Sequence, residues 1–137
     1  MSKDLDFLKK HIVDSYLVSY GIKLQFLQLE FNNEQYEEIV ISIDCNINCD
    51  SLEISKLVSP FSELSEDTFE LAYFIPLNNK KVTNCNIKGN SIFLKFDDGI
   101  EIEFDLSKDG SDVGFNFKER RKNNRVTFSI DHNSFVN

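Results

Sequence analysis

Two runs of alternating apolar residues, joined by an Asp-Gly pair, constrain the fold more than any other feature of this chain. The runs are IFLKF before the pair, residues 92–96, and IEIEFDL after it, residues 100–106. Successive side chains of a strand point to opposite faces of a sheet, and Asp-Gly supplies the positive φ angles of a type I′ turn. The sequence therefore predicts an antiparallel hairpin over 92–106 with a two-residue turn at Asp98-Gly99.

The same alternation gathers like charges on the polar face of this hairpin. Glu101, Glu103 and Asp105 share one face of the second strand, and Asp97 and Asp98 lie at the turn. Alternate residues of a strand lie about 7 Å apart, within a Debye length at physiological salt, so these carboxylates repel one another modestly. Two interpretations are open: a solvated face that resists edge pairing, or a surface that docks a basic protein.

A second hairpin is predicted nearer the C-terminus, where residues 113–117 alternate opposite residues 126–130. Its tip is KERRKNNR, residues 118–125, in which five bases stand against one acid. Five further strands are predicted over 22–26, 27–31, 39–43, 69–75 and 82–87. The alternation slips by one residue between Phe26 and Leu27, which predicts a β-bulge or a strand that crosses between two environments.

A helix is predicted over residues 3–19, capped by Ser2 and stopped at Gly21. Its apolar stripe consists of Leu5, Leu8, Ile12 and Tyr16. Residues 32–35 predict a turn, and residues 45–68 read as irregular with one short helix. LQLEF at 27–31 also resembles IFLKF at 92–96, which suits either an internal duplication or two amphipathic hairpins that look alike.

The length of 137 residues fits one domain, 1–137, large enough to bury a core without disulfides or a metal. The expected fold class is α+β, with the N-terminal helix packed on a mainly antiparallel, curved sheet of about six to eight strands. The expected core residues are Leu8, Ile12, Tyr16, Leu29, Phe31, Ile41, Ile43, Leu71, Leu94, Phe96, Ile102, Phe104, Phe115 and Phe128.

Charge and hydropathy narrow the classes of partner. The net charge of −8 argues against general binding to nucleic acids or anionic membranes, which need a cationic surface. No apolar run approaches the roughly 18 residues of a membrane span, and the N-terminus lacks the pattern of a signal peptide, so we expect a cytoplasmic protein that does not bind membranes.

The sequence has few residues and motifs suited to catalysis or metal binding. Cys45 and Cys49 form a C-x3-C pair, but neither His11 nor His132 lies at ligand spacing from them, so we expect reduced thiols, no metal and no cofactor. The sequence has no nucleophile elbow and no glycine-rich phosphate loop. We therefore predict no catalytic residues and a protein that is not an enzyme.

The size, acidity and α+β layout, together with IFLKFDDGIEIEFDL at 92–106 and the N-terminal helix, resemble the small acidic immunity proteins of bacterial contact-dependent growth inhibition and related polymorphic toxin systems. This resemblance implies a protein that neutralises one cognate toxin, often a nuclease, by covering its active site or a nearby surface. Those immunity proteins differ widely in fold, so the resemblance transfers no functional residue to this chain.

The leading functional prediction is stoichiometric binding of a basic protein, such as a cognate toxin domain, through an acidic surface. The predicted binding residues are Asp97, Asp98, Glu101, Glu103 and Asp105. One alternative is a nucleic-acid-binding or regulatory module that acts through Arg120, Arg121, Lys122 and Arg125. Another is a structural subunit of a larger assembly, which an exposed apolar patch would signal. The sequence leaves the oligomeric state open.

Overall fold

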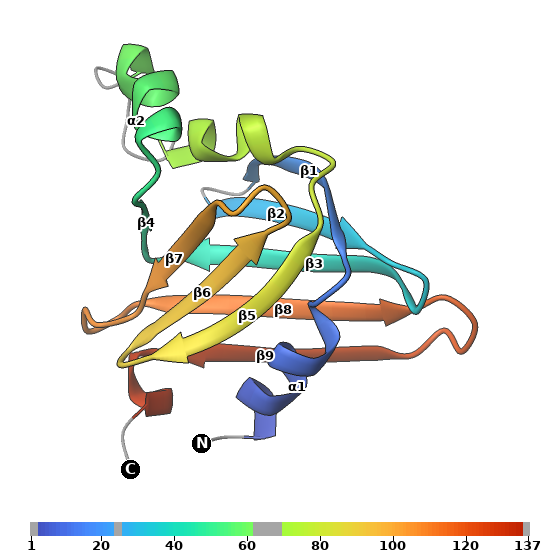
Figure 1. The fold of residues 1–137 in the computed structure, drawn as a ribbon. Helices are drawn as coiled ribbons and strands as arrows, with labels where there is room; N and C mark the ends of the chain where they lie inside the picture. The colour runs from blue at the N-terminus through green and yellow to red at the C-terminus, as the bar shows by residue number, and fades with distance from the viewer. Residues whose placement is uncertain (1–2, 24–25, 62–69, 136–137) are drawn as a thin grey trace.

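The strands of this chain form two antiparallel sheets that face each other, with the core between them (Figure 1). The computed structural model describes residues 3–23, 26–61 and 70–135. Within these ranges the α+β class and the antiparallel pairing are confirmed. The strands are divided between a five-stranded and a four-stranded sheet, whereas the sequence predicted one continuous sheet.

The five-stranded sheet has the order β1-β2-β3-β8-β9. Its strands are β1 (Tyr16–Lys23), β2 (Phe26–Asn32), β3 (Tyr36–Asp44), β8 (Asp112–Glu119) and β9 (Arg125–Asp131). The predicted C-terminal hairpin is confirmed, since Phe115 pairs with Phe128 in the β8–β9 register. The turn predicted at 32–35 is confirmed as well, and the Asn33 side chain accepts hydrogen bonds there from the backbone N–H groups of Gln35 and Tyr36.

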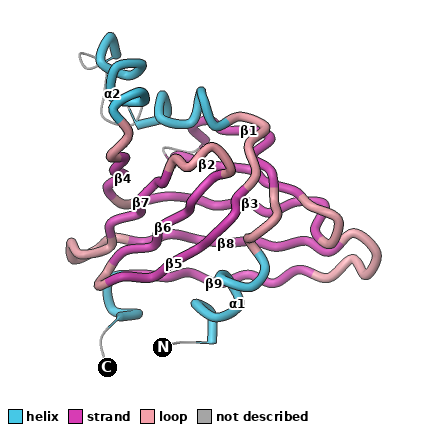
Figure 2. The backbone as a smooth tube through the Cα atoms, viewed as in Figure 1, coloured by secondary structure: helices cyan, strands magenta, loops and turns pink. Residues whose placement is uncertain are grey.

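The four-stranded sheet has the order β4-β7-β6-β5. Its strands are β4 (Asn46–Cys49), β7 (Glu101–Asp105), β6 (Ser91–Phe96) and β5 (Val82–Lys88). Only Cys45 separates β3 from β4, so this segment passes from one sheet to the other at a corner (Figure 2). The short strand β4 falls in the region predicted as irregular, where four residues with one buried Ile give almost no alternation.

The hairpin predicted over 92–106 is confirmed as β6–β7, but its turn is of another type. Gly99 has a φ of +87°, whereas Asp98 is not among the residues with positive φ. The backbone N–H of Gly99 donates to the Phe96 oxygen at 2.9 Å, and the N–H of Phe96 donates to the Ile100 oxygen at 2.8 Å. This is a three-residue loop with glycine in the left-handed position, not a type I′ turn.

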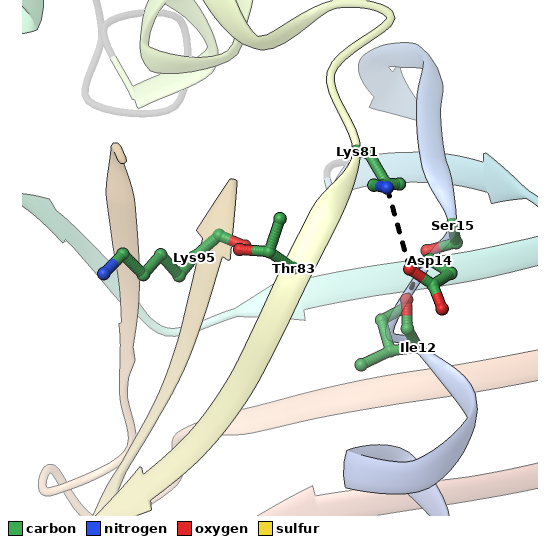
Figure 3. Close-up of polar contacts among 6 residues, drawn as sticks. All are labelled: Ile12, Asp14, Ser15, Lys81, Thr83 and Lys95. Carbon is green, nitrogen blue, oxygen red and sulfur yellow. Dashed lines mark hydrogen bonds and ion pairs between the residues drawn. The ribbon is translucent and has the colours of Figure 1, made fainter. Parts of the chain in front are cut away.

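Helix α1 (Lys3–His11) is shorter than predicted, and Tyr16 begins a strand. The helix stops because Asp14 adopts a φ of +70° and donates its backbone N–H to the Val82 oxygen at 2.8 Å. The Ser15 hydroxyl donates to the Ile12 oxygen at 2.6 Å, which fixes the junction (Figure 3). The apolar residues at 12, 16 and 17 fit both a helical and a strand periodicity. Contacts with β5 therefore determine where the helix ends and the strand begins. The cap predicted at Ser2 lies outside the described residues.

The slip in alternation near Phe26 is not a bulge. Strand β1 ends at Lys23 and β2 begins at Phe26, antiparallel to it, so the two phases belong to two strands of a hairpin. The intervening residues 24–25 lie outside the described part of the chain. A register shift does occur in β1, between Leu17 and Ser19.

The described part of the strand predicted over 69–75, residues 70–75, is helical instead. Residues 72–77 form the 3₁₀ helix η2 (Ala72–Leu77), which contains Pro76, and Phe69 lies outside the described residues. The other short helices are α2 (Leu52–Val58), η1 (Ser59–Phe61) and η3 (His132–Phe135). Helix α2 is the short helix predicted within 45–68, and the Ser51 hydroxyl caps it by accepting the Ile54 N–H.

The core prediction is confirmed for most positions. Leu8, Phe31 and Phe104 are fully buried, and one contiguous cluster includes residues from both sheets and α1. Three predicted core residues differ: Tyr16 is 44% exposed, and Leu71 and Phe128 are partly buried. Helix α1 contacts β5 of one sheet and β9 of the other, so it lies against an edge of each sheet.

Candidate acidic interface

The acidic face predicted for residues 101–105 is the outward face of β7, the strand between β4 and β6. Ile102 and Phe104 point into the core with no exposed surface, which leaves Glu101, Glu103 and Asp105 on the opposite face. The strand register places Lys95 of β6 opposite Glu101. Figure 3 shows the Lys95 side chain extending away from Thr83 toward β7.

Glu103 is held by both neighbouring strands. One carboxylate oxygen accepts a hydrogen bond from the Ser91 hydroxyl of β6 at 2.6 Å, and the other accepts from the Asn48 amide of β4 at 3.2 Å. Asp98 and Asp105 are also engaged, since they accept the backbone N–H groups of Ile100 and Ser107. These contacts fix the positions of three of the predicted carboxylates, so the face is preorganised.

A hollow of about 550 Å³ opens over this face. Five carboxylates line it, and no basic residue is among its described lining residues. The acidic residues that line it are Asp50, Glu53, Asp98, Glu101 and Glu103. The structure therefore brings three predicted residues together, whereas Asp97 and Asp105 are not among the lining residues.

Asp50 and Glu53 were missed by the sequence analysis. Asp50 follows β4, and Glu53 lies in the first turn of α2, where a carboxylate suits the positive end of the helix. Their contribution depends on β4 pairing with β7, because this pairing carries residues 50–53 to the edge of the acidic face. The local signal for Glu53 was its place two residues after the capping Ser51, in the first turn of the helix.

The basic loop does not face this acidic strand. Lys118, at the start of the loop, belongs to β8 of the five-stranded sheet, whereas Glu103 and Asp105 belong to β7 of the four-stranded sheet. Its ammonium lies 3.0 Å from the Glu37 carboxylate of β3 instead. The basic residue Lys118 therefore pairs with an acidic residue of its own sheet, not with the acidic face of β7.

Two of the four predicted basic site residues are engaged locally. The Arg120 guanidinium donates to the Asn33 carbonyl at 2.8 Å, and Arg125 donates to the Asn116 side chain at 3.1 Å. In the part of the chain that the structure describes, Arg121 and Lys122 are exposed and form no ion pair. The loop thus presents two uncommitted cations rather than a basic face.

A second acidic group lies on the outer face of the five-stranded sheet and was also missed. Asp44, Asp112 and Asp131 are aligned across β3, β8 and β9 by the strand register. Burial, then the charges of Asp131 and Asp44, raises the pKa of Asp112 above its usual value. Residues so far apart in sequence show no common pattern until the strand pairing is known.

The cysteines are free thiols in the structure. Burial raises the pKa of Cys85 to about 12, and burial followed by the charges of Glu70, Asp105 and Asp44 raises the pKa of Cys45 to about 12. Thiols with so high a pKa are poor nucleophiles at neutral pH. Across the described ranges, no group of three or more His, Cys, Asp or Glu side chains could hold a metal ion.

No described helix is long and apolar enough to cross a membrane. No family model matches the chain, and no curated protein or solved structure matches it either.

Proposed function

We propose that this protein is a stoichiometric binding module that receives a basic segment of another protein in the hollow over β7. The observation that carries this proposal is the hollow lined by five carboxylates and no base. A lysine- or arginine-rich loop placed there would meet carboxylates from two separate segments of the chain, residues 50–53 and residues 98–103. Such charge complementarity mainly accelerates the association of the two proteins and fixes their relative orientation, and it adds less to the affinity.

The outer face of the four-stranded sheet also presents an apolar side chain among these acidic residues. Phe93 of β6 lines the hollow beside the acids and is partly exposed. The Lys88 ammonium lies 5.7 Å from the centroid of this ring, so an arginine of the partner would replace a lysine there. An arginine side chain can stack on an aromatic face while it donates to carboxylates, which a lysine does less well. The proposal therefore favours arginine over lysine as the central residue of the partner's loop.

The more specific form of the proposal is an immunity protein that neutralises a cognate bacterial toxin domain such as a nuclease. Nucleases need cationic surfaces to bind their substrates, so an acidic inhibitor could cover such a surface by imitating the charge of the polyanion. The net charge of −8, the preorganised carboxylates and the resemblance described above support this form. In this role the protein binds and inhibits without catalysis.

Affinity capture with charge-reversed baits tests the proposal. The test bait carries Asp50→Lys and Glu101→Lys, which line the hollow and are exposed. The matched control carries Asp6→Lys and Glu34→Lys, which give the same net charge but lie in α1 and in the β2–β3 turn. We expect the wild type and the control to retain one basic protein from the native cell lysate, and the test bait to lose it.

The retained protein is then purified, and its activity is measured with increasing wild-type protein. Full inhibition at a molar ratio of about one is expected for a stoichiometric inhibitor. Equal retention by all three baits would refute the hollow as the site. Recovery of nucleic acid in place of protein, lost as salt rises, would instead favour the loop with Arg121 and Lys122.

A further inference from the structure

The sheet edges of this fold are protected unequally. Phe7 of α1 contacts Phe128 of β9 edge to face, with ring centroids 5.7 Å apart, and α1 also contacts β5. The edge strand β4 is only four residues long. Natural proteins shield edges by such coverage and brevity, because an unpaired edge invites another strand. By these criteria β1 is the least shielded edge.

In the ranges that the structure describes, only the first part of β1 has a backbone partner on its outer side. Leu17 donates its N–H to the Lys80 oxygen at 3.0 Å and accepts the Asn79 N–H, and Tyr16 forms a bridge with Lys81. Among the described residues, no backbone hydrogen bond is formed on this side from residue 18 to residue 23. Within the described part of the chain, the outward N–H and C=O groups of residues 19–23 therefore have no backbone partner and could pair with a strand from another molecule.

Exposed apolar side chains accompany this free edge. Val18 is 40% exposed and Ile22 is 45% exposed, although both lie in a strand that pairs with β2. The register shift next to Val18 is one device that discourages edge pairing. It lies before residue 19, however, so it leaves the regular stretch from Ser19 to Lys23 unaffected.

The charges around this edge select the kind of partner. No acidic residue occurs from residue 15 to residue 29, in a chain whose net charge is −8, although the β1–β2 register places Glu30 opposite Ser19. Lys23 lies at one end of the free stretch, and Lys80 and Lys81 adjoin its other end. Among the described residues at this edge, Lys81 forms an ion pair with Asp14 at 3.8 Å, and this pair is weak because the Asp14 side chain is exposed (Figure 3).

We propose that the free edge of β1, residues 19–23, binds an extended segment of another protein that has acidic residues near its ends and apolar residues between them. The segment would add a strand to the five-stranded sheet through backbone hydrogen bonds, the mode known as β-augmentation. A second copy of this chain fits poorly. Antiparallel self-pairing would bring Lys23 of each copy toward Lys80 and Lys81 of the other, and would join two bodies of charge −8.

The test uses a synthetic peptide, acetyl-EVTVTVE-amide, and NMR spectra of the full-length protein at about 0.15 M salt. We expect the amide signals of residues 18–23 to shift, and their hydrogen exchange to slow, as the peptide is added. A peptide with lysine in place of both glutamates should bind about fivefold more weakly, as two exposed ion pairs predict. A peptide N-methylated at alternate residues should not bind.

A protein variant checks the role of charge. Lys23→Glu with Lys81→Glu should weaken binding of the glutamate peptide and strengthen binding of the lysine peptide, whereas Lys56→Glu with Lys108→Glu, at positions away from the edge, should change neither. Shifts confined to other strands, or equal affinity for both peptides, would overturn the proposal. So would peptide-free protein that sediments as a dimer with protected β1 amides, because the edge would then be occupied by a second copy.

This surface is separate from the acidic hollow. Loss of peptide binding at β1 would leave the capture of a basic protein unaffected, and failure of that capture would leave the peptide result unaffected. The two experiments therefore judge the two proposals independently.

Discussion

Asp112 stands between two other carboxylates on the outer face of the five-stranded sheet. Its neighbours in the register are Asp44 of β3 and Asp131 of β9. Because its pKa is raised, the charged form of Asp112 is less favourable in the folded protein than in the unfolded chain. Neutral pH therefore carries an electrostatic cost at this position, and acidification through the raised pKa relieves it.

Replacing Asp112 with Asn should stabilise the protein at pH 7. Removing one of three adjacent like charges should raise the free energy of unfolding by a few tenths to about 1 kcal/mol, because solvent screens an exposed group. Urea unfolding at pH 7 and at about pH 3 measures this effect, which should vanish when the carboxylates are protonated. Asp109→Asn, in the neighbouring turn, is the control. A destabilised Asp112→Asn protein at pH 7 would contradict the interpretation.

Glu103 has a structural role that its neighbour Glu101 lacks. Glu103→Ala would remove the acceptor of the Ser91 hydroxyl, which belongs to a residue only 6% exposed, and should cost about 1–2 kcal/mol of stability. Glu103→Gln retains an acceptor and should cost less. Glu101→Ala, exposed and opposite Lys95, should change stability by less than about 0.5 kcal/mol. Thermal or urea unfolding of the three variants distinguishes these values.

Helix α1 depends on a histidine at its C-terminal end. His11 Nδ1 lies 3.0 Å from the Tyr36 hydroxyl, and the imidazole also packs against Phe7, at a centroid distance of 4.2 Å. Burial, then the charge of Lys10, lowers the pKa of His11 below 6.5, although Gln35 and Glu119 oppose the shift. Tyr36 faces it from β3 with a pKa that burial raises, so Tyr36 stays neutral near pH 6.

This environment makes the anchoring of α1 dependent on pH. Between the lowered pKa of His11 and 6.5, the unfolded chain binds more protons than the folded protein, so stability falls as pH decreases through this window. We expect the melting temperature to decrease between about pH 7.5 and pH 5.5, and the decrease to be smaller in His11→Gln. An unchanged slope in His11→Gln would show that other groups cause the dependence.

The elements that could be predicted from the sequence are those whose partner is close in sequence. The β6–β7 and β8–β9 hairpins each show two alternating runs around a polar turn, so their register follows from local pattern. The end of α1 at His11 could not be predicted, because it depends on Asp14 bonding to Val82. The acidic hollow was half predicted for the same reason, since Asp50 and Glu53 reach it only through the pairing of β4 with β7.

Connections between the two sheets determine how the whole molecule should unfold. The sheets are connected by the β3–β4 corner at Cys45, by the segment 106–111 between β7 and β8, and by backbone bonds between residues 14–17 and residues 79–82. One cluster of buried side chains includes residues from both sheets. Since neither sheet has a core of its own, we expect them to lose structure together.

Two cysteines report on this cooperativity from different places. Cys45 lies at the corner between the sheets, and Cys85 lies in β5. Burial is the main cause that raises the pKa of each thiol to about 12. At about pH 8 both thiols should therefore react with iodoacetamide only after the chain opens. A Cys49→Ser protein retains just these two reporters.

We expect Cys45 and Cys85 to become reactive at the same urea concentration, and at the midpoint measured by circular dichroism, when each site is quantified by mass spectrometry. Coincident midpoints would mean that the corner opens only when the core is lost, as a single cooperative unit requires. Earlier labelling of Cys45 alone would mean that β4 and the corner detach first. The acidic hollow, which β4 and β7 build together, would then be lost before the rest of the fold, and binding of a basic partner should protect Cys45 selectively.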